Sequence, residues 1–324
     1  MIIVTGGAGF IGSAYVWKCN QKGIKDIVIV DNLNTSTKWL NLRTLTYQDY
    51  IHKDNFINLI KNNKIEYKVK AIIHMGACSS TTEMNSDYLM ENNYRYTKLL
   101  ANWSLKNNVR FIYASSAATY GDGEKGFDDD HNQMTSFSPI NPYGYSKHLF
   151  DLVAKEEGIL DKIVGLKFFN VFGPNEYHKE SMRSVVCKAH HQILESNEIK
   201  LFKSYNDQYE DGGQKRDFIY IKDCIDIIDW FVDNPDKNGI FNVGTGEAKT
   251  WNQLAQALFK ALKKEPNINY IDMPDNIKNQ YQYFTQANMG KLKDLGYSKP
   301  FFSLEDAVED YVSNYLNKQN RYLS

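Results

Sequence analysis

Short apolar runs alternate with amphipathic stretches through the first half of the chain. The apolar runs are four to six residues long, which is typical of buried parallel strands, and the stretches between them carry apolar residues at helical spacing. Strands that alternate with helices form a parallel, doubly wound sheet, which binds ligands at the carboxyl ends of its strands. The predicted class is therefore α/β. The predicted strands are 1–5, 27–30, 71–74, 109–114 and 163–168, and the predicted helices are 11–20, 54–62, 88–107 and 143–158.

After about residue 170 the pattern becomes irregular. Polar loops surround a predicted helix at 181–194, and residues 208–215 form a polar insertion that contains glycine. Residues 216–221 and 239–244 again have the character of strands. We therefore expect a smaller, discontinuous α/β substrate-binding lobe, interleaved with the first.

A glycine-rich turn joins the first predicted strand to the first predicted helix. Gly6, Gly9 and Gly12 follow one another at intervals of three residues. Glycine permits a tight turn and lets backbone N–H groups approach a pyrophosphate at the positive end of the helix. Asp31 ends the second predicted strand about 20 residues further on, where an acidic residue binds the ribose of a dinucleotide. The first lobe is thus predicted to be a Rossmann dinucleotide-binding unit.

Composition excludes several other classes of protein. The chain has 324 residues and a net charge of −1, so neither nucleic acid nor an acidic membrane surface is indicated as a partner. The cysteines form no C-x-x-C pair, which predicts no metal site and no disulfide framework and fits a reducing cytoplasm. No signal peptide or membrane-spanning run is expected. These cysteines are Cys19, Cys78, Cys187 and Cys224.

A serine, a tyrosine and a lysine form the predicted catalytic group. Tyr143 and Lys147 are four positions apart in a predicted helix, so they share one face. Lys147 is expected to place positive charge near the Tyr143 hydroxyl and to lower its pKa, because an unperturbed phenol with a pKa of about 10 is a poor base at neutral pH. Ser116 follows the strand predicted at 109–114 and can hydrogen-bond the same oxygen. This group could remove a proton from a sugar hydroxyl.

These motifs resemble the extended short-chain dehydrogenase/reductase family. The resemblance implies that the first lobe binds NAD(P) and that the second binds a sugar nucleotide. The family motifs recur in order at 5–12, 115–121, 143–147, 169–174, 216–220 and 242–246. Our approximate boundaries assign 1–168 and 217–243 to the dinucleotide-binding domain, and 169–216 and 244–324 to the sugar-nucleotide-binding domain.

A narrower resemblance concerns the family of ADP-glyceromanno-heptose 6-epimerases. Dehydratases carry an Asp-Glu pair where this chain has Ala117 and Ala118, whose methyl groups cannot shuttle a proton. The resemblance implies conversion of ADP-D-glycero-D-manno-heptose to the L-glycero epimer, a precursor of the lipopolysaccharide core, through a 6-keto intermediate. It also implies two acid/base groups, Tyr143 and Lys179, one for each face of that intermediate. The matching stretches are 76–83, 115–121, 175–179 and 281–287.

The resemblance also carries binding residues over to this chain. Arg216 suits a diphosphate, since a guanidinium can bind it through two hydrogen bonds. Two positions depart from the family, which has an acidic residue at Met75 and a histidine at Lys188. The implied cofactor contacts are Gly6, Gly9, Phe10, Ile11, Gly12, Asp31, Asn32, Lys38, Lys53, Met75, Gly76, Ala77, Cys78, Ser79, Asn92, Lys147, Val171 and Lys179. The implied substrate contacts are Asn170, Ser181, Lys188, Phe202, Lys203, Ser204, Tyr205, Arg216 and Tyr281.

The residues alone leave the cofactor open. Asp31 favours NAD, whereas Lys38 and Lys53 could bind the 2′-phosphate of NADP, and the resemblance favours NADP. The resemblance also implies a homo-oligomer, with a pentamer as the candidate size.

Other functions remain as alternatives. One is another nucleotide-sugar epimerase or reductase, such as a UDP-hexose 4-epimerase. A second is a redox-sensing protein that binds a dinucleotide without turnover, against which the Ser116, Tyr143 and Lys147 set argues. A metal-dependent hydrolase is poorly supported, because no ligand spacing accompanies His190 and His191.

Overall fold

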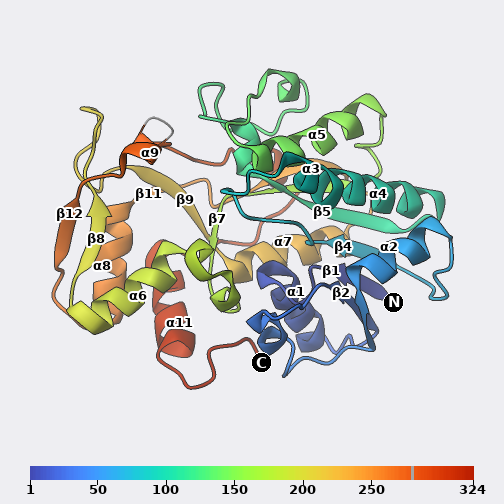
Figure 1. Cartoon of the computed structure of the whole chain (residues 1–324), viewed down its shortest axis with the longest axis horizontal. Coiled ribbons are helices and arrows are strands. Elements are labelled where there is room, and N and C mark those ends of the chain that lie inside the picture. Colours follow the sequence, from blue (N-terminus) through green and yellow to red (C-terminus); the bar gives the residue numbers. More distant parts are fainter. Residues whose placement is uncertain (279–280) are drawn as a thin grey trace.

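The first lobe is built on a parallel sheet. The computed structural model describes residues 1–278 and 281–324, and these contain a seven-stranded sheet in the order β10-β6-β5-β4-β1-β2-β3 (Figure 1). The order reverses between β1 and β4, which creates the point where open α/β sheets bind ligands. The strands are β1 (Ile2–Thr5), β2 (Ile27–Asp31), β3 (Asp49–His52), β4 (Ala71–His74), β5 (Arg110–Ser116), β6 (Val164–Phe168) and β10 (Gly239–Val243).

Helices cover both faces of this sheet. Alternate residues of β1 enter different cores: Val4 packs in the core that also holds α1 and α7, and Ile3 packs in the core beneath α2, α4 and α5. In Figure 1, α4 and α5 lie above β5, and α7 and α1 lie below it. The predicted doubly wound α/β class is therefore confirmed. The helices are α1 (Phe10–Gln21), α2 (Lys53–Lys61), α4 (Tyr96–Lys106), α5 (Pro142–Glu156) and α7 (Ile221–Asp233).

Two local features differ from the predicted pattern. The single helix predicted at 88–107 comprises α3 (Ser86–Leu89), a π-helical turn η2 (Met90–Arg95) and α4. β3 was not predicted, because it lies at the sheet edge and its residues are polar or only partly buried. Short 3-10 turns connect the elements: η1 (Thr37–Asn41), η3 (Ala117–Tyr120), η4 (Met134–Ser136) and η5 (Tyr177–Met182).

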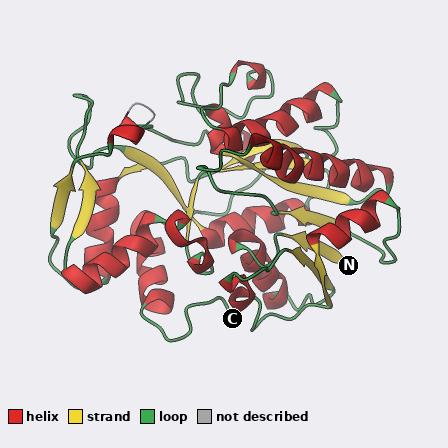
Figure 2. Cartoon of the chain, viewed as in Figure 1, coloured by secondary structure: helices red, strands yellow, loops and turns green. Residues whose placement is uncertain are grey.

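The second lobe contains the remaining strands. In the described residues, β11, β9 and β7 form a three-stranded sheet, and β12 and β8 pair as a two-stranded sheet (Figure 2). We assigned 217–243 to the first lobe; β9 instead pairs with β7 and β11, whereas β10 joins the large sheet. The strands are β7 (Asn170–Phe172), β8 (Ile199–Phe202), β9 (Lys215–Tyr220), β11 (Ala248–Thr250) and β12 (Ile268–Ile271). The helices are α6 (Val185–Ser196), α8 (Trp251–Ala261), α9 (Asp275–Lys278), α10 (Gly290–Asp294), α11 (Leu304–Tyr311) and the π-helical η6 (Val312–Leu316).

The chain returns to the first lobe after η6. The indole Nε1 of Trp17 on α1 donates to the carbonyl of Ser324 at 3.2 Å, and Figure 1 shows the C-terminus beside α1. Residues 320–324 therefore connect the second lobe back to the first. Among the described helices, none has the length and apolar character that crossing a bilayer requires.

Candidate active site

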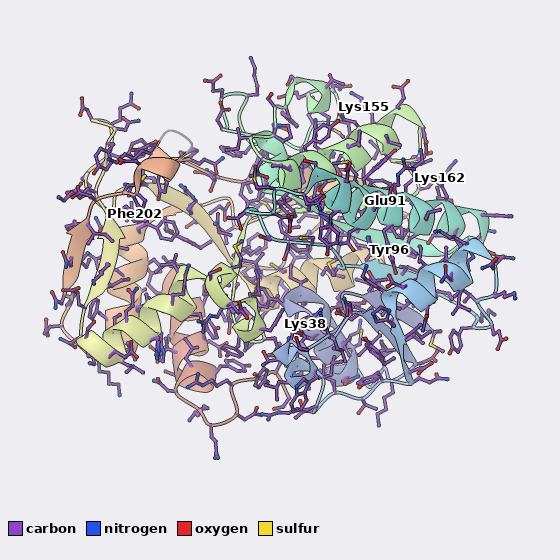
Figure 3. All side chains as sticks on the ribbon, in the orientation of Figure 1. Lys38, Glu91, Tyr96, Lys155, Lys162 and Phe202 are labelled. Atoms are coloured by element: carbon purple, nitrogen blue, oxygen red, sulfur yellow. The ribbon has the colours of Figure 1, made fainter. Side chains whose placement is uncertain are left out.

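A cavity of about 450 Å³ opens at the carboxyl ends of β1, β2 and β4. Its walls come from the glycine turn, from residues after β2 and β4, from the helical segment that contains Asn92 and Tyr96, and from His178 and Lys179. Figure 3 shows Lys38 and Tyr96 on the first lobe and Phe202 on the second. Of the predicted cofactor contacts, the structure places these in the lining: Gly6, Gly9, Phe10, Ile11, Gly12, Asp31, Asn32, Lys38, Lys53, Met75, Gly76, Ala77, Ser79, Asn92 and Lys179.

The glycine turn is held too tightly for other residues. Gly6 has a φ of +63°, and a Cβ there would lie 2.6 Å from the backbone nitrogen of Gly76. A Cβ at Gly12 would lie 2.1 Å from the Gly6 carbonyl oxygen. Within the described chain, Gly9 caps α1 without any side-chain hydrogen bond, so the first N–H groups of the helix are left for a ligand. A bare helix N-terminus on a cavity fits the diphosphate of a dinucleotide.

Both carboxylate oxygens of Asp31 accept hydrogen bonds from the protein. Its Oδ2 accepts from the Ala8 N–H at 2.9 Å, and its Oδ1 accepts from Lys38 Nζ at 2.6 Å and from the Asn32 N–H at 2.7 Å. Lys53 also faces the cavity and donates to Asn92 Oδ1 at 3.2 Å. The cavity is therefore lined by two ammonium groups, one after β2 and one at the start of α2, together with a carboxylate that is already paired.

Tyr143 and Lys147 lie on the first turns of α5. The helix begins after Asn141, whose side chain accepts from the Gly144 N–H at 2.7 Å, and Pro142 occupies its first turn. Ser116 ends β5, and its side chain opposes the rise in the pKa of the Tyr143 phenol. The structure thus joins the predicted serine and tyrosine.

The expected effect of Lys147 on Tyr143 is contradicted. Burial raises the pKa of Tyr143, and the hydrogen bond from Ser116 acts in the opposite direction. Lys147 is itself buried, donates to the Ala114 carbonyl at 2.8 Å, and has its pKa lowered to about 8 by burial. The sequence pattern could not reveal this, because both side chains leave solvent together when α5 packs on the sheet.

The group formed by Ser116, Tyr143 and Lys147, which we call the tyrosine group, lies beside the cavity rather than in its lining. In the described residues, the lining does not include Ser116, Tyr143, Lys147, Cys78 or Val171. Asn93 connects the two regions: it accepts from the Cys78 N–H at 2.8 Å and donates to the Cys78 carbonyl and to Ser146 Oγ, each at 3.0 Å. The loop after β4 is thereby attached to α5.

Lys179 faces the same cavity from the turn η5. Its Nζ lies 5.5 Å from the centre of the Phe10 ring. Burial lowers the pKa of Lys179, and the Glu176 carboxylate acts in the opposite direction. A lysine with a lowered pKa next to a dinucleotide-type cavity is suited to proton transfer.

Arg216 lies between two aromatic rings in the second lobe. Its guanidinium carbon is 5.2 Å from the centre of the Tyr281 ring and 5.8 Å from that of Trp251, and Trp251 Nε1 donates to the Tyr281 hydroxyl at 3.0 Å. The Phe202 ring packs edge-on against Tyr281 at 6.3 Å. Burial lowers the pKa of Arg216. A buried cation stacked on rings is a suitable partner for an anion.

The other predicted substrate residues form separate groups. Tyr205 and Lys203 both bind Asp272, at 2.8 and 3.3 Å, and Lys188 Nζ donates to the Ser181 carbonyl at 3.3 Å. Asn170 is exposed on β7, in register with Phe218 of β9. The Ser204 hydroxyl donates to the Asn206 carbonyl at 2.8 Å. The structure thus brings together Phe202, Arg216 and Tyr281 but not the whole set.

The insertion at 208–215 supports β8. The Gly212 N–H donates to the Phe202 carbonyl at 3.2 Å, and Gln214 Nε2 donates to the Lys203 carbonyl at 3.3 Å. The insertion therefore helps to position the strand that carries Phe202.

Comparison with known proteins identifies the family. The model of the NAD dependent epimerase/dehydratase family matches residues 2–244. The chain belongs to this family. It is 55% identical over 323 residues to the ADP-L-glycero-D-manno-heptose-6-epimerase of Nitratidesulfovibrio vulgaris and 48% identical over 332 residues to that of Fusobacterium nucleatum, and each match covers 100% of both chains.

A solved structure supports the same relationship. The Helicobacter pylori ADP-L-glycero-D-manno-heptose-6-epimerase superposes with a TM-score of 0.78 at 28% identity, covering 97% of this chain and 95% of that one. Membership of the family makes this chain an enzyme of the isomerase class with a nicotinamide cofactor.

Two residues of this family member were missed from the sequence. His178 lines the cavity, and burial together with the positive charges of Lys38 and Lys179 lowers its pKa to about 4. It lies in the stretch 175–179, where the resemblance to the epimerase family implies a role only for Lys179. Trp251 had no local signal, because its partner Arg216 becomes a neighbour only when β11 pairs with β9.

Proposed function

We propose that this enzyme converts ADP-D-glycero-D-manno-heptose to ADP-L-glycero-D-manno-heptose at C6, with bound NADP, in the supply of heptose for the lipopolysaccharide core. The printed names of full-length relatives at 55% and 48% identity support the substrate. The observation that carries the mechanism is the pair of proton-transfer candidates around one cavity: Lys179 in its lining, and Tyr143 beside the loop that forms its wall.

The residues of the cavity fit a dinucleotide. The N-terminal N–H groups of α1 would hold the diphosphate, and Lys38 and Lys53 would hold the 2′-phosphate of NADP. Asp31 keeps both carboxylate oxygens on protein donors, which leaves the ammonium of Lys38 as the group facing the ligand. When bound, NADP supplies a hydride acceptor and donor for C6.

Two side chains would transfer the proton at the C6 oxygen. The Tyr143 phenolate would remove the proton from the C6 hydroxyl of one epimer and become a neutral phenol, and the Ser116 side chain, which favours the phenolate, lowers the cost of forming it. The keto sugar then presents its other face, and Lys179 Nζ delivers the proton from that side. Burial lowers the pKa of Lys179, which makes its ammonium a stronger proton donor.

The second lobe would bind the nucleotide. Arg216 would pair with the diphosphate, while Phe202, Trp251 and Tyr281 form apolar and aromatic surface around it. We further propose a cytoplasmic homo-oligomer. The four cysteines are free, which supports a reducing compartment.

Incubation of the purified protein with ADP-D-glycero-D-manno-heptose and NADP tests the proposal. The expected result is an NMR spectrum that approaches a mixture of both C6 epimers with no net consumption of NADPH. Conversion of UDP-glucose instead would identify a UDP-hexose 4-epimerase, and stoichiometric oxidation of NADPH would identify a reductase; either result would overturn the proposal.

A further inference from the structure

Asn175 is a buried junction between parts of the chain that are far apart in sequence. It is completely buried, and its backbone adopts a left-handed φ of 78°. Its Nδ2 donates to Ser13 Oγ on α1 at 2.9 Å, its Oδ1 accepts from the Leu323 N–H at 3.0 Å, and its carbonyl accepts from Asn41 Nδ2 at 3.1 Å. Asn41 also donates to the Ala8 carbonyl at 2.9 Å. Asn175 is thus bonded directly to α1 and, through Asn41, to the glycine turn.

The next residue, Glu176, is tied to the second lobe. Its carboxylate is completely buried and accepts from the Ser184 hydroxyl at 2.7 Å, from the Tyr311 hydroxyl at 3.1 Å and from the Gly173 N–H at 3.2 Å. Ser184 caps α6, and Tyr311 ends α11. Asn175 and Glu176 therefore attach one segment to both lobes. Lys179 lies three residues after Glu176 in that segment.

Residues 320–324, which we call the strap, reinforce the first-lobe side. Besides the bond from Leu323 to Asn175, Thr44 Oγ1 donates to the Leu323 carbonyl at 3.2 Å and Tyr177 OH donates to the Arg321 carbonyl at 2.7 Å. The Leu323 side chain is completely buried, and Figure 1 shows the chain running from α11 back to the first lobe. The strap therefore holds both Asn175 and Tyr177, which flank Glu176.

We propose that Asn175 is a positioning residue that, together with the strap, fixes the segment 173–182 so that Lys179 faces the cofactor cavity. The inference rests on the proposed role of Lys179 in proton transfer. The side-chain hydrogen-bond partners of Asn175, Ser13 and Leu323, belong neither to the described cavity lining nor to the group of Ser116, Tyr143 and Lys147, so Asn175 touches no reacting group and acts through the elements it joins. Proton transfer is sensitive to displacements of about 1 Å, which a loosened segment would permit.

Asn175→Gly is the informative variant, because glycine accepts the positive φ without strain and removes only the side-chain bonds. Hydrogen–deuterium exchange of the full-length protein is expected to accelerate in 176–183. The kcat for epimerisation should fall about 10- to 100-fold, with the KM for the sugar nucleotide within about threefold of wild type. Asn63→Gly is the matched control: Asn63 has a φ of 51°, is exposed and is not part of the cavity lining, so exchange, kcat and KM should all stay unchanged.

A double-mutant cycle separates positioning from general damage. If Asn175 acts through Lys179, adding Asn175→Gly to Lys179→Met lowers kcat no further; a second full drop in kcat would overturn the proposal. If Asn175→Gly does not fold, Leu323→Ala loosens the strap instead and should accelerate exchange in the same segment. Unchanged exchange in 176–183 would contradict the proposal whether or not the protein turns over ADP-heptose, so failure of the proposed function is seen separately, as absent turnover in the wild type.

Discussion

Lys38 forms an ion pair with Asp31, with 2.6 Å between its Nζ and Oδ1. The pair lies at the end of β2, where the ribose of a dinucleotide is expected. Because the carboxylate also accepts two backbone N–H groups, it is oriented by the protein and is less available to ribose hydroxyls. Lys38 and Lys53 both line the cavity.

This arrangement predicts a preference for NADP over NAD. Lys38→Ala should weaken NADP⁺ binding about tenfold or more, because a charged hydrogen bond contributes about 1.5–3 kcal/mol, while NAD⁺ binding changes little. Isothermal titration of both cofactors measures this. Lys61→Ala, at the exposed end of α2, is the control and should leave both affinities unchanged. Tighter binding of NAD⁺ by the wild type would refute the preference.

Removal of the Tyr143 hydroxyl should abolish most activity without unfolding the site. Tyr143→Phe is expected to lower kcat by about 10²–10⁴, the usual contribution of a positioned acid/base group, and Ser116→Ala should lower it by less. Cofactor affinity should be retained, since neither side chain lies in the described lining of the cavity. Full activity of Tyr143→Phe would assign the proton transfer to another residue.

Acid stability should depend on His74. It is buried between Thr5 Oγ1 at 2.5 Å and Thr97 Oγ1 at 2.9 Å, and burial, aided by the charge of Lys147, lowers its pKa to about 3. Between pH 3 and 6.5 the unfolded chain binds the proton and the folded protein does not, so stability falls as the pH decreases through this window. From pH 7 to pH 5 this single group should cost about 2 kcal/mol of unfolding free energy.

Urea denaturation at both pH values tests the effect. His74→Gln loses the hydrogen bonds at every pH, but its stability should decline by about 2 kcal/mol less than that of the wild type between pH 7 and pH 5. An equal decline in the two proteins would show that other groups control the loss of stability at low pH.

A further prediction concerns a buried ion pair that involves α5, the helix that carries Tyr143. Lys167 and Asp151 are both inaccessible to solvent and lie 2.6 Å apart, and Asp151 also accepts from the hydroxyls of Tyr113 and Ser115. Asp151→Asn should destabilise the protein by about 3–5 kcal/mol, because it leaves the Lys167 charge buried without its partner.

The matched double variant distinguishes charge from packing. Asp151→Leu with Lys167→Met removes both charges and should recover a large part of the stability lost in the single variant, as measured by chemical denaturation. A double variant that is less stable than Asp151→Asn would mean that the network of hydroxyl groups matters more than the pair.

The first lobe was predictable because its signals are local. The apolar runs, the glycine turn and the four-residue spacing of Tyr143 and Lys147 are each fixed within a few residues of sequence. Edge strand β3 escaped prediction because Asp49 and His52 interrupt its apolar character. The local sequence pattern also could not show which strands would pair with residues 215–220.

The candidate site was predictable in its residue types but not in its electrostatics. Lys147 was expected to lower the pKa of Tyr143, yet burial determines the direction for both groups. The enclosure of Arg216 by Trp251 and Tyr281, and the junction at Asn175, join residues tens to hundreds of positions apart. Such contacts depend on tertiary packing, which a single sequence does not specify.

The most direct measurement follows the hydrogen on C6. ADP-D-glycero-D-manno-heptose deuterated at C6 is incubated with the enzyme in ordinary water, and the product is examined by NMR and mass spectrometry. Transient oxidation by a bound nicotinamide cofactor predicts that the L-glycero product keeps its deuterium, because the same hydride returns. A product with ordinary hydrogen at C6 would contradict the account, since it would mean that the centre inverts through exchange with solvent.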